Sequence, residues 1–374
     1  MTFSFGVDGA TAYLIDDEGE LSRGAAREAA ERRATLHHHP LALLRAALAP
    51  GAQLTNVRVE AGRAAVDVAT ADGTFTLAID RRTNLPVSIT SPAYDAVLGD
   101  VTLETMFDGY QDAGGLNLPT RLIARRDRGV VAELEVSRNV VDEVLDDVAA
   151  PAKLPPPTAA IAAVTVEPLA DGVWVLGGQS HHSVLIELAD RALLVETPLD
   201  EARTRAVIAK AREVVAAKPL THAIMSHHHH DHAGGIRTAI AEGLTIVAHH
   251  AAKTFVEDLA ARRHTIAKDA LAMQPRPLTL ETVTDETVFG GGHTVALYPI
   301  EGNAHAATLL MVYVPHARIL ITADLFDRSS SGRFPFAANL VANVRRCGLD
   351  VERLVGLHGR PVPFAEVVAA ATPP

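Results

Sequence analysis

The chain has 374 residues, of which 48% are hydrophobic and 21% are charged, and its formal net charge is −11. This length suits two domains, and the composition is that of a water-soluble globular protein. The acidic charge argues against nucleic-acid binding, and the apolar stretches fall short of the roughly 20 residues that span a bilayer. We therefore expect no nucleic-acid partner and no membrane span.

The compartment is predicted from cysteine use and from the first residues. Cys347 is the single cysteine, so no internal disulfide can form. The first residues contain neither the basic region nor the apolar core of a signal peptide. We expect a cytoplasmic location for the chain as given, whereas a periplasmic or secreted location would require an export signal that was left off.

The sequence pattern of residues 1–150 predicts an antiparallel β-rich domain that begins with helices and is smaller than the domain that follows it. The helical region covers about residues 24–48 and breaks at His39-Pro40, because proline has no N–H to donate. Its strand rhythm and its Leu-Pro turns at 85–86 and 118–119 resemble the curved sheets of bacterial lipoprotein-carrier proteins. Short alternating runs predict strands at residues 57–59, 65–68, 75–79, 87–89, 101–104 and 130–136.

Residues 151–160 predict a linker. The run from Pro151 to Pro157 contains four prolines, which neither a helix nor a central strand accommodates. Such a stretch is typical of a stiff connection between domains. We therefore expect an accessory domain at 1–150 and a second domain at 161–374.

The second domain predicts an α/β fold, because strands alternate with helices. Two β-rich halves with outer helices predict a four-layer αββα sandwich, in which sites tend to lie at strand ends. The strand at 354–357 is expected to be the last element. The expected strands lie at 173–176, 183–188, 192–195, 221–225, 245–248, 293–298, 309–314, 319–322 and 354–357, and the expected helices at 200–217, 236–241, 251–262 and 338–347.

A histidine-rich loop follows the strand at 221–225. It contains the pattern His227-x-His229-x-Asp231-His232, followed by two glycines. Imidazole nitrogen and carboxylate oxygen are zinc ligands, and residues two apart in an extended segment point the same way. His227 and His229 can therefore converge on one ion, while Asp231 and His232 address a second. The intervening histidines, at 228 and 230, are expected to be loop residues or to support the ligands.

Three further residues follow predicted strands and can reach the same sheet edge. They are His305, Asp324 and His358. The order His-x-His-x-Asp-His, then His, then Asp, then His-Gly resembles the metallo-β-lactamase superfamily of binuclear hydrolases across the whole second domain. The resemblance implies a first metal on His227, His229 and His305, a second on Asp231, His232 and His358, and Asp324 as the bridge.

Two positions in this chain indicate which metal and which activity within this superfamily are expected. Iron-binding flavoprotein relatives have Glu where this chain has His229, so two zinc ions are expected, with iron or manganese as alternatives. Antibiotic-hydrolysing relatives commonly have Cys where this chain has Asp324, which favours thioesterase, lactonase or phosphodiesterase activity instead. Glu196 stands where the superfamily usually has a structural Asp.

The expected chemistry is hydrolysis of a small-molecule ester, lactone, thioester or phosphodiester by a metal-bridging hydroxide. Asp231 is expected to orient the hydroxide and to carry a proton. His181 and His182 lie in a turn that related enzymes place over the metals, and they are expected to contact the substrate.

Two other functions stay open at this point. One is a di-iron oxidoreductase on the same fold, and the other is a ligand-binding protein whose metal site is not catalytic. The first domain has three open roles, which are covering the active site, mediating homodimerisation and binding lipid.

Overall fold

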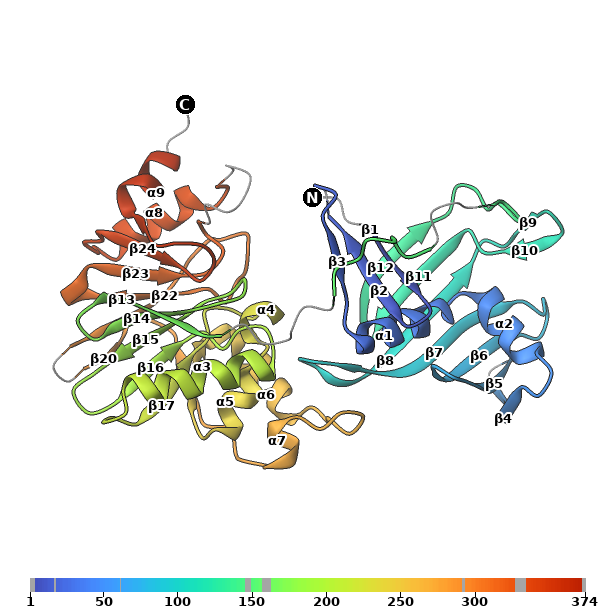
Figure 1. Ribbon diagram of the computed structural model, residues 1–374, viewed down its shortest axis with the longest axis horizontal. Helices are drawn as coiled ribbons and strands as arrows, with labels where there is room; N and C mark the ends of the chain where they lie inside the picture. Colours follow the sequence, from blue (N-terminus) through green and yellow to red (C-terminus); the bar gives the residue numbers. More distant parts are fainter. Residues whose placement is uncertain are drawn as a thin grey trace. The chain divides into compact units, whose positions relative to one another are not determined.

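The computed structural model describes residues 4–16, 18–60, 62–144, 149–156, 163–290, 293–326 and 334–371 (Figure 1). Contacts divide the chain into two compact units. Unit 1 comprises Met1–Tyr94 and Asp100–Ala160, and unit 2 comprises Asp95–Gly99 and Ile161–Pro374. Within the described residues, no helix combines the length and apolar character needed to cross a membrane.

Unit 1 is built from antiparallel sheets and two helices. The helices are α1 (Ala26–Leu36) and α2 (Pro40–Leu48), and they are separated at the predicted break, with Pro40 in the first turn of α2. A three-stranded sheet contains β1 (Ser4–Asp8), β2 (Thr11–Ile15) and β3 (Leu21–Arg23). A hairpin of β9 (Gln111–Ala113) and β10 (Leu116–Leu118) stands apart from the larger sheet.

A seven-stranded sheet forms the body of unit 1. Along β6, alternation places Phe75 and Leu77 on the buried face, where they join Leu43 of α2 in the core. In sheet order its strands are β12 (Gly129–Glu135), β11 (Arg121–Arg126), β8 (Gly99–Asp108), β7 (Pro86–Asp95), β6 (Gly73–Asp80), β5 (Arg63–Thr70) and β4 (Gln53–Glu60).

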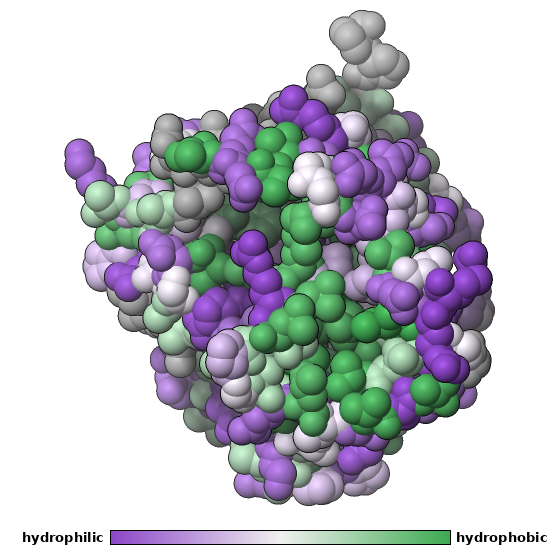
Figure 2. Space-filling view, turned by 90° about the vertical axis from the view of Figure 1, so that its right-hand side faces the viewer, coloured by the Kyte–Doolittle hydropathy of each residue, from purple (hydrophilic) through white to green (hydrophobic). Residues whose placement is uncertain are grey.

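An exposed apolar area lies on unit 1. Figure 2 shows hydrophobic residues gathered in a band on this face, bordered by hydrophilic ones. Among the exposed apolar residues of unit 1 are Leu48 of α2 and Leu54, Val57 and Val59 of β4, which is the last strand of its sheet. An edge strand of this kind can pair with another chain, so β4 is the natural place to test the predicted homodimer.

Unit 2 contains two sheets with helices on their outer faces, which confirms the predicted four-layer sandwich. The first sheet has the order β13 (Thr165–Ala170), β14 (Val173–Gly177), β15 (Ser183–Glu187), β16 (Ala192–Val195), β17 (Leu220–Ile224), β18 (Thr245–His249) and β19 (Leu280–Val283). The second has the order β20 (Thr287–Phe289), β21 (Val295–Pro299), β22 (Leu310–Val314), β23 (Ile319–Thr322), β24 (Arg353–Gly356) and β25 (Val362–Pro363).

Three apolar layers hold the sandwich together. Along β16, Leu193 and Val195 face the second sheet, whereas Ala192 and Leu194 face the outer helices. The first sheet is covered by α3 (Glu201–Val214), α5 (Ile236–Ala241), α6 (Lys253–Ala261) and α7 (Ala270–Met273), and the second by α8 (Ala337–Arg346) and α9 (Phe364–Ala370).

The expectation that a strand near 354–357 is the last element is wrong. The structure adds β25, which pairs antiparallel with β24, and then α9. Phe364 and Val367 of α9 are buried in the outer core beside α8. A two-residue strand gives no alternation to detect, and a helix this short gives little periodicity.

Candidate metal centre

The histidine-rich loop begins where β17 ends, and it turns directly into the short helix α4 (His230–Ala233). The two glycines that follow it, Gly234 and Gly235, allow its backbone to approach neighbouring residues closely. A Cβ on Gly234 would lie 2.0 Å from the Leu199 carbonyl oxygen, and one on Gly235 would lie 1.8 Å from Oγ1 of Thr204. Larger residues would push α4 and its side chains away from the sheet edge.

One cluster of side chains contains His227, His229, His305 and Asp324, whose ligand atoms all lie within 4.8 Å of one another. The Nε2 atoms of His227 and His305 are 3.3 Å apart. His227 is fully buried. Nitrogen and oxygen donors that converge in this way form a set that suits a zinc-like ion.

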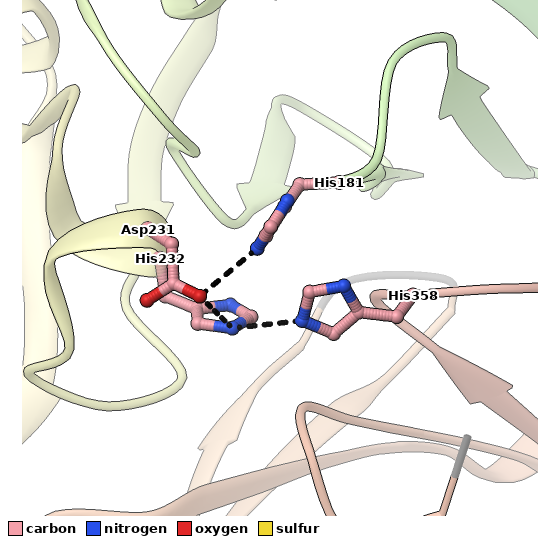
Figure 3. Close-up of side chains that lie close together, drawn as sticks. All are labelled: His181, Asp231, His232 and His358. Carbon is pink, nitrogen blue, oxygen red and sulfur yellow. Dashed lines mark hydrogen bonds and ion pairs between the residues drawn. The ribbon is translucent and has the colours of Figure 1, made fainter. Parts of the chain in front are cut away.

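A second cluster contains His181, Asp231, His232 and His358, again within 4.8 Å (Figure 3). The Nε2 atoms of His358 and His232 are 3.1 Å apart. Nε2 of His181 lies 3.2 Å from Oδ2 of Asp231. The structure therefore brings together the three residues predicted for the second metal and adds His181 to them.

Asp324 lies between the two clusters. Its Oδ2 is 2.8 Å from Nε2 of His305 and 3.1 Å from Nε2 of His227, and its Oδ1 is 2.8 Å from Nε2 of His358. Oδ2 also lies 3.2 Å from Nε2 of His232. The backbone of Asp324 has φ of 60°, a left-handed conformation that Asp and Asn tolerate better than most residues. One carboxylate thus faces ligands of both predicted metals.

Glu196 supports the second cluster from beneath. It is fully buried, and its Oε2 accepts hydrogen bonds from Nδ1 of His232 at 2.9 Å and from Oγ of Ser226 at 2.5 Å. Because a carboxylate only accepts, Nδ1 of His232 carries the proton and Nε2 faces the cluster. The longer side chain at this position therefore still reaches the histidine loop.

The electrostatics of the site favour a cation. Burial alone would lower the pKa of His232, but the carboxylates of Glu196 and Asp324 outweigh it and raise the pKa to about 10. Burial opposes the charged form of Asp324, yet hydrogen bonds from His227, His232 and His358 hold its pKa far below the usual range. Negative charge is thus concentrated where the imidazole nitrogens converge.

Two other histidines are kept neutral at physiological pH. Burial lowers the pKa of His181 to about 4, with the neighbouring His358 and His232 acting in the same direction. Burial and the nearby His227 lower the pKa of His229 to about 4. A metal needs neutral imidazole, so these side chains bind without first losing a proton. The donor chemistry therefore fits two divalent ions.

The remaining histidines of the loop lie outside both clusters. Nδ1 of His228 is 2.7 Å from Oγ1 of Thr308, whereas His230 is exposed and stacks on Phe255. Spacing gives no signal for Thr308, because its partner lies 80 residues earlier. For His182, the backbone N–H donates to the Leu357 carbonyl at 2.9 Å. The substrate contacts predicted for His181 and His182 stay predictions.

Comparison with known proteins gives one family and many structural neighbours. The family model described as the metallo-beta-lactamase superfamily matches residues 176–362, half of the chain. The structure is similar to a metallo-beta-lactamase from Pontibacter korlensis at 16% identity and a TM-score of 0.45, covering 56% of this chain and 97% of the other.

Two further neighbours have similar scores. A metallo-beta-lactamase from Hirschia baltica has 18% identity and a TM-score of 0.44, with 56% of this chain and 96% of the other covered. The flavodiiron protein from Giardia intestinalis has 14% identity and a TM-score of 0.45, with 56% of this chain and 59% of the other covered.

Proposed function

The chain belongs to the metallo-beta-lactamase superfamily, and from that premise we propose that it is a hydrolase that uses two zinc ions. Its substrate is a small ester, lactone, thioester or phosphodiester. The observation that carries the proposal is the position of Asp324, whose two oxygens face imidazoles of both clusters. A shared carboxylate is what holds two ions at the short separation of a binuclear site.

In the proposed site, His227, His229 and His305 hold one ion, while Asp231, His232 and His358 hold the other. Asp324 contributes to both. When bound, the ions supply a hydroxide at neutral pH and polarise the oxygen of the bond to be cleaved. This chemistry requires no serine or cysteine nucleophile, and Cys347, at the end of α8, is not in either cluster.

The protein side chains control proton position and ligand orientation. Asp231 is the most exposed member of the second cluster, with its side chain 49% accessible, so its carboxylate can hold a proton and pass it to solvent or to a leaving group. Glu196 fixes the ring of His232 through Nδ1. Ser226 contacts Nδ1 of His227 at 3.0 Å and orients that ring in the same way.

Zinc is proposed over iron because position 229 is His, where the iron-binding relatives noted above have Glu. A carboxylate at 324, in place of cysteine, supports ester-like or phosphodiester substrates over β-lactam antibiotics. We propose residues 161–374 as the catalytic domain and residues 1–150 as an accessory domain. Of the proposed linker, residues 151–156 form neither helix nor strand, and residues 157–160 lie outside the described residues.

The test combines metal analysis with a substrate panel. Untagged full-length protein is analysed for metal, then assayed on chromogenic esters, lactones, thioesters and phosphodiesters before and after chelation. We expect nearly two zinc ions per chain and turnover that chelation abolishes and added zinc restores. Two iron ions with no hydrolysis would instead indicate the oxidoreductase. Metal without turnover on any substrate would indicate a binding protein, and either result overturns the proposal.

A further inference from the structure

We propose that His181 is an additional protein ligand of the second metal, beside Asp231, His232 and His358. This inference rests on the two-metal site of the proposed function and deepens it, because it gives His181 a role other than the predicted substrate contact. It makes the two metal positions unequal, since the second gains one more donor from the protein.

The side chain of His181 is placed as a ligand would be. The residue is only 7% exposed, and its ring centroid lies 4.0 Å from that of His358 and 5.0 Å from that of His232. Nε2 is the atom that faces the cluster, 3.2 Å from Oδ2 of Asp231. Figure 3 shows its ring directed at the same point as those of His232 and His358.

The other ring nitrogen of His181 has a hydrogen-bonding partner outside the cluster. Nδ1 of His181 lies 2.8 Å from Oγ of Ser180. Metal-binding histidines usually have a partner of this kind on the nitrogen that does not bind, which fixes the orientation of the ring. A histidine that meets only a transient substrate has no comparable need for such fixing.

The turn that carries His181 is anchored by a buried arginine. Arg203 of α3 is 1% exposed, and its Nη2 donates to the carbonyls of Leu176 at 3.2 Å, Gly177 at 3.0 Å and His181 at 3.2 Å. Here these bonds all go to one turn, so the arginine fixes the backbone from which the His181 side chain projects.

A backbone hydrogen bond fixes the position of His181 relative to His358. The backbone N–H of His182 donates to the carbonyl of Leu357 at 2.9 Å, so the residue after His181 is bonded to the residue before His358. This bond joins the first sheet to the second at the end of β24. The two imidazoles are therefore held in register by the backbone, which is the pre-organisation that a metal ligand requires.

The test measures metal binding directly and does not depend on turnover. Full-length protein is stripped of metal with a chelator and titrated with Co²⁺, following the visible absorption and the heat of binding. The variants are His181→Ala and His181→Gln, with His230→Ala as the control, because His230 belongs to the loop that carries Asp231 and His232 but lies outside both clusters. Melting of the stripped proteins checks that each variant is folded.

We expect both His181 variants to weaken one of the two Co²⁺ affinities by at least about tenfold, the lower end of what loss of a supporting contact produces. X-ray absorption of the loaded protein should show fewer imidazoles per cobalt, and His230→Ala should match the wild type. Unchanged affinities and spectra in folded His181 variants would overturn this assignment while leaving the two-metal site intact. A wild-type chain that binds no Co²⁺ would overturn the proposed function as well.

Discussion

Replacing Glu196 with glutamine tests whether the buried carboxylate tunes the second metal site. Glu196→Gln keeps the shape and retains an oxygen that can accept from Nδ1 of His232, but it removes the charge. The carboxylate is fully buried, so solvent does not screen its interaction with His232. The change therefore removes the charge from the hydrogen bonds that Glu196 accepts from Ser226 and from Nδ1 of His232.

The expected loss of zinc affinity follows from the hydrogen bond between Glu196 and His232. A hydrogen bond to a charged group contributes about 1.5–3 kcal/mol, and a neutral one about 0.5–1.5 kcal/mol. The loss is then about 1–1.5 kcal/mol, which corresponds to roughly tenfold in affinity. We expect Glu196→Gln to weaken zinc at the second site by about this factor and to leave the first site, which Glu196 does not contact, within about twofold.

The assay is a competition titration of zinc against a chromophoric chelator, with the melting temperature of the metal-free protein as a check on folding. Glu187→Gln is the control, because Glu187 lies at the other end of the β15–β16 pair and bonds Lys218 at 2.8 Å. Equal zinc affinity in Glu196→Gln and the wild type would refute the argument. Equal weakening in both variants would show that general charge, and not the bond to His232, is responsible.

Three further outcomes are expected. Asp324→Asn keeps a residue that tolerates φ of 60° but loses the shared charge, so bound zinc after dialysis should fall from two ions to one or fewer by elemental analysis, and retention of two would contradict the bridge. Gly235→Ala should lower the free energy of unfolding by about 1–3 kcal/mol because its Cβ would overlap Thr204. Gly290→Ala, whose Cβ would come no nearer than 3.9 Å to the described residues around it, should be neutral in denaturant titrations. Burial lowers the pKa of His38 from 6.5 to about 4, so His38 resists protonation when the protein is folded. The free energy of unfolding of unit 1 should therefore fall by about 3 kcal/mol as the pH falls from 6.5 to 4, with no loss above 6.5. Hydrogen exchange in β6 to β8 would measure this loss, and an equal loss in His38→Asn would exclude His38 as its cause.

Much of the fold follows from the sequence because its strongest patterns are local. The helix break at Pro40, the alternation along β6 and the strand–helix rhythm of unit 2 each depend on neighbouring residues. Strand β11 is not predicted, because Arg121, Arg125 and Arg126 interrupt its apolar pattern. Its pairing with β8 and β12 is decided by residues far away in the chain.

The candidate site, like the fold, is predictable from the sequence only in part. The spacing of the histidine-rich loop indicates a metal by itself, and His305, Asp324 and His358 are recognisable because each follows a strand. The place of His181 is not predictable from spacing, since it depends on the carbonyl contacts of Arg203 and on a backbone bond to Leu357. The support from Thr308 likewise arises only when the two sheets pack together, whereas Ser226 reaches Glu196 through the pairing of β16 with β17.

The assignment of ligands to both sheets has a consequence for how the protein acquires metal during synthesis. The first cluster is complete only when Asp324, after β23, has joined the fold, and the second must wait for His358, after β24. A growing chain that has made only the histidine-rich loop can bind an ion loosely and with the wrong partners. If the two clusters hold metal as proposed, correct loading would be coupled to the docking of the second sheet, and metal availability in the cell would influence the yield of folded protein.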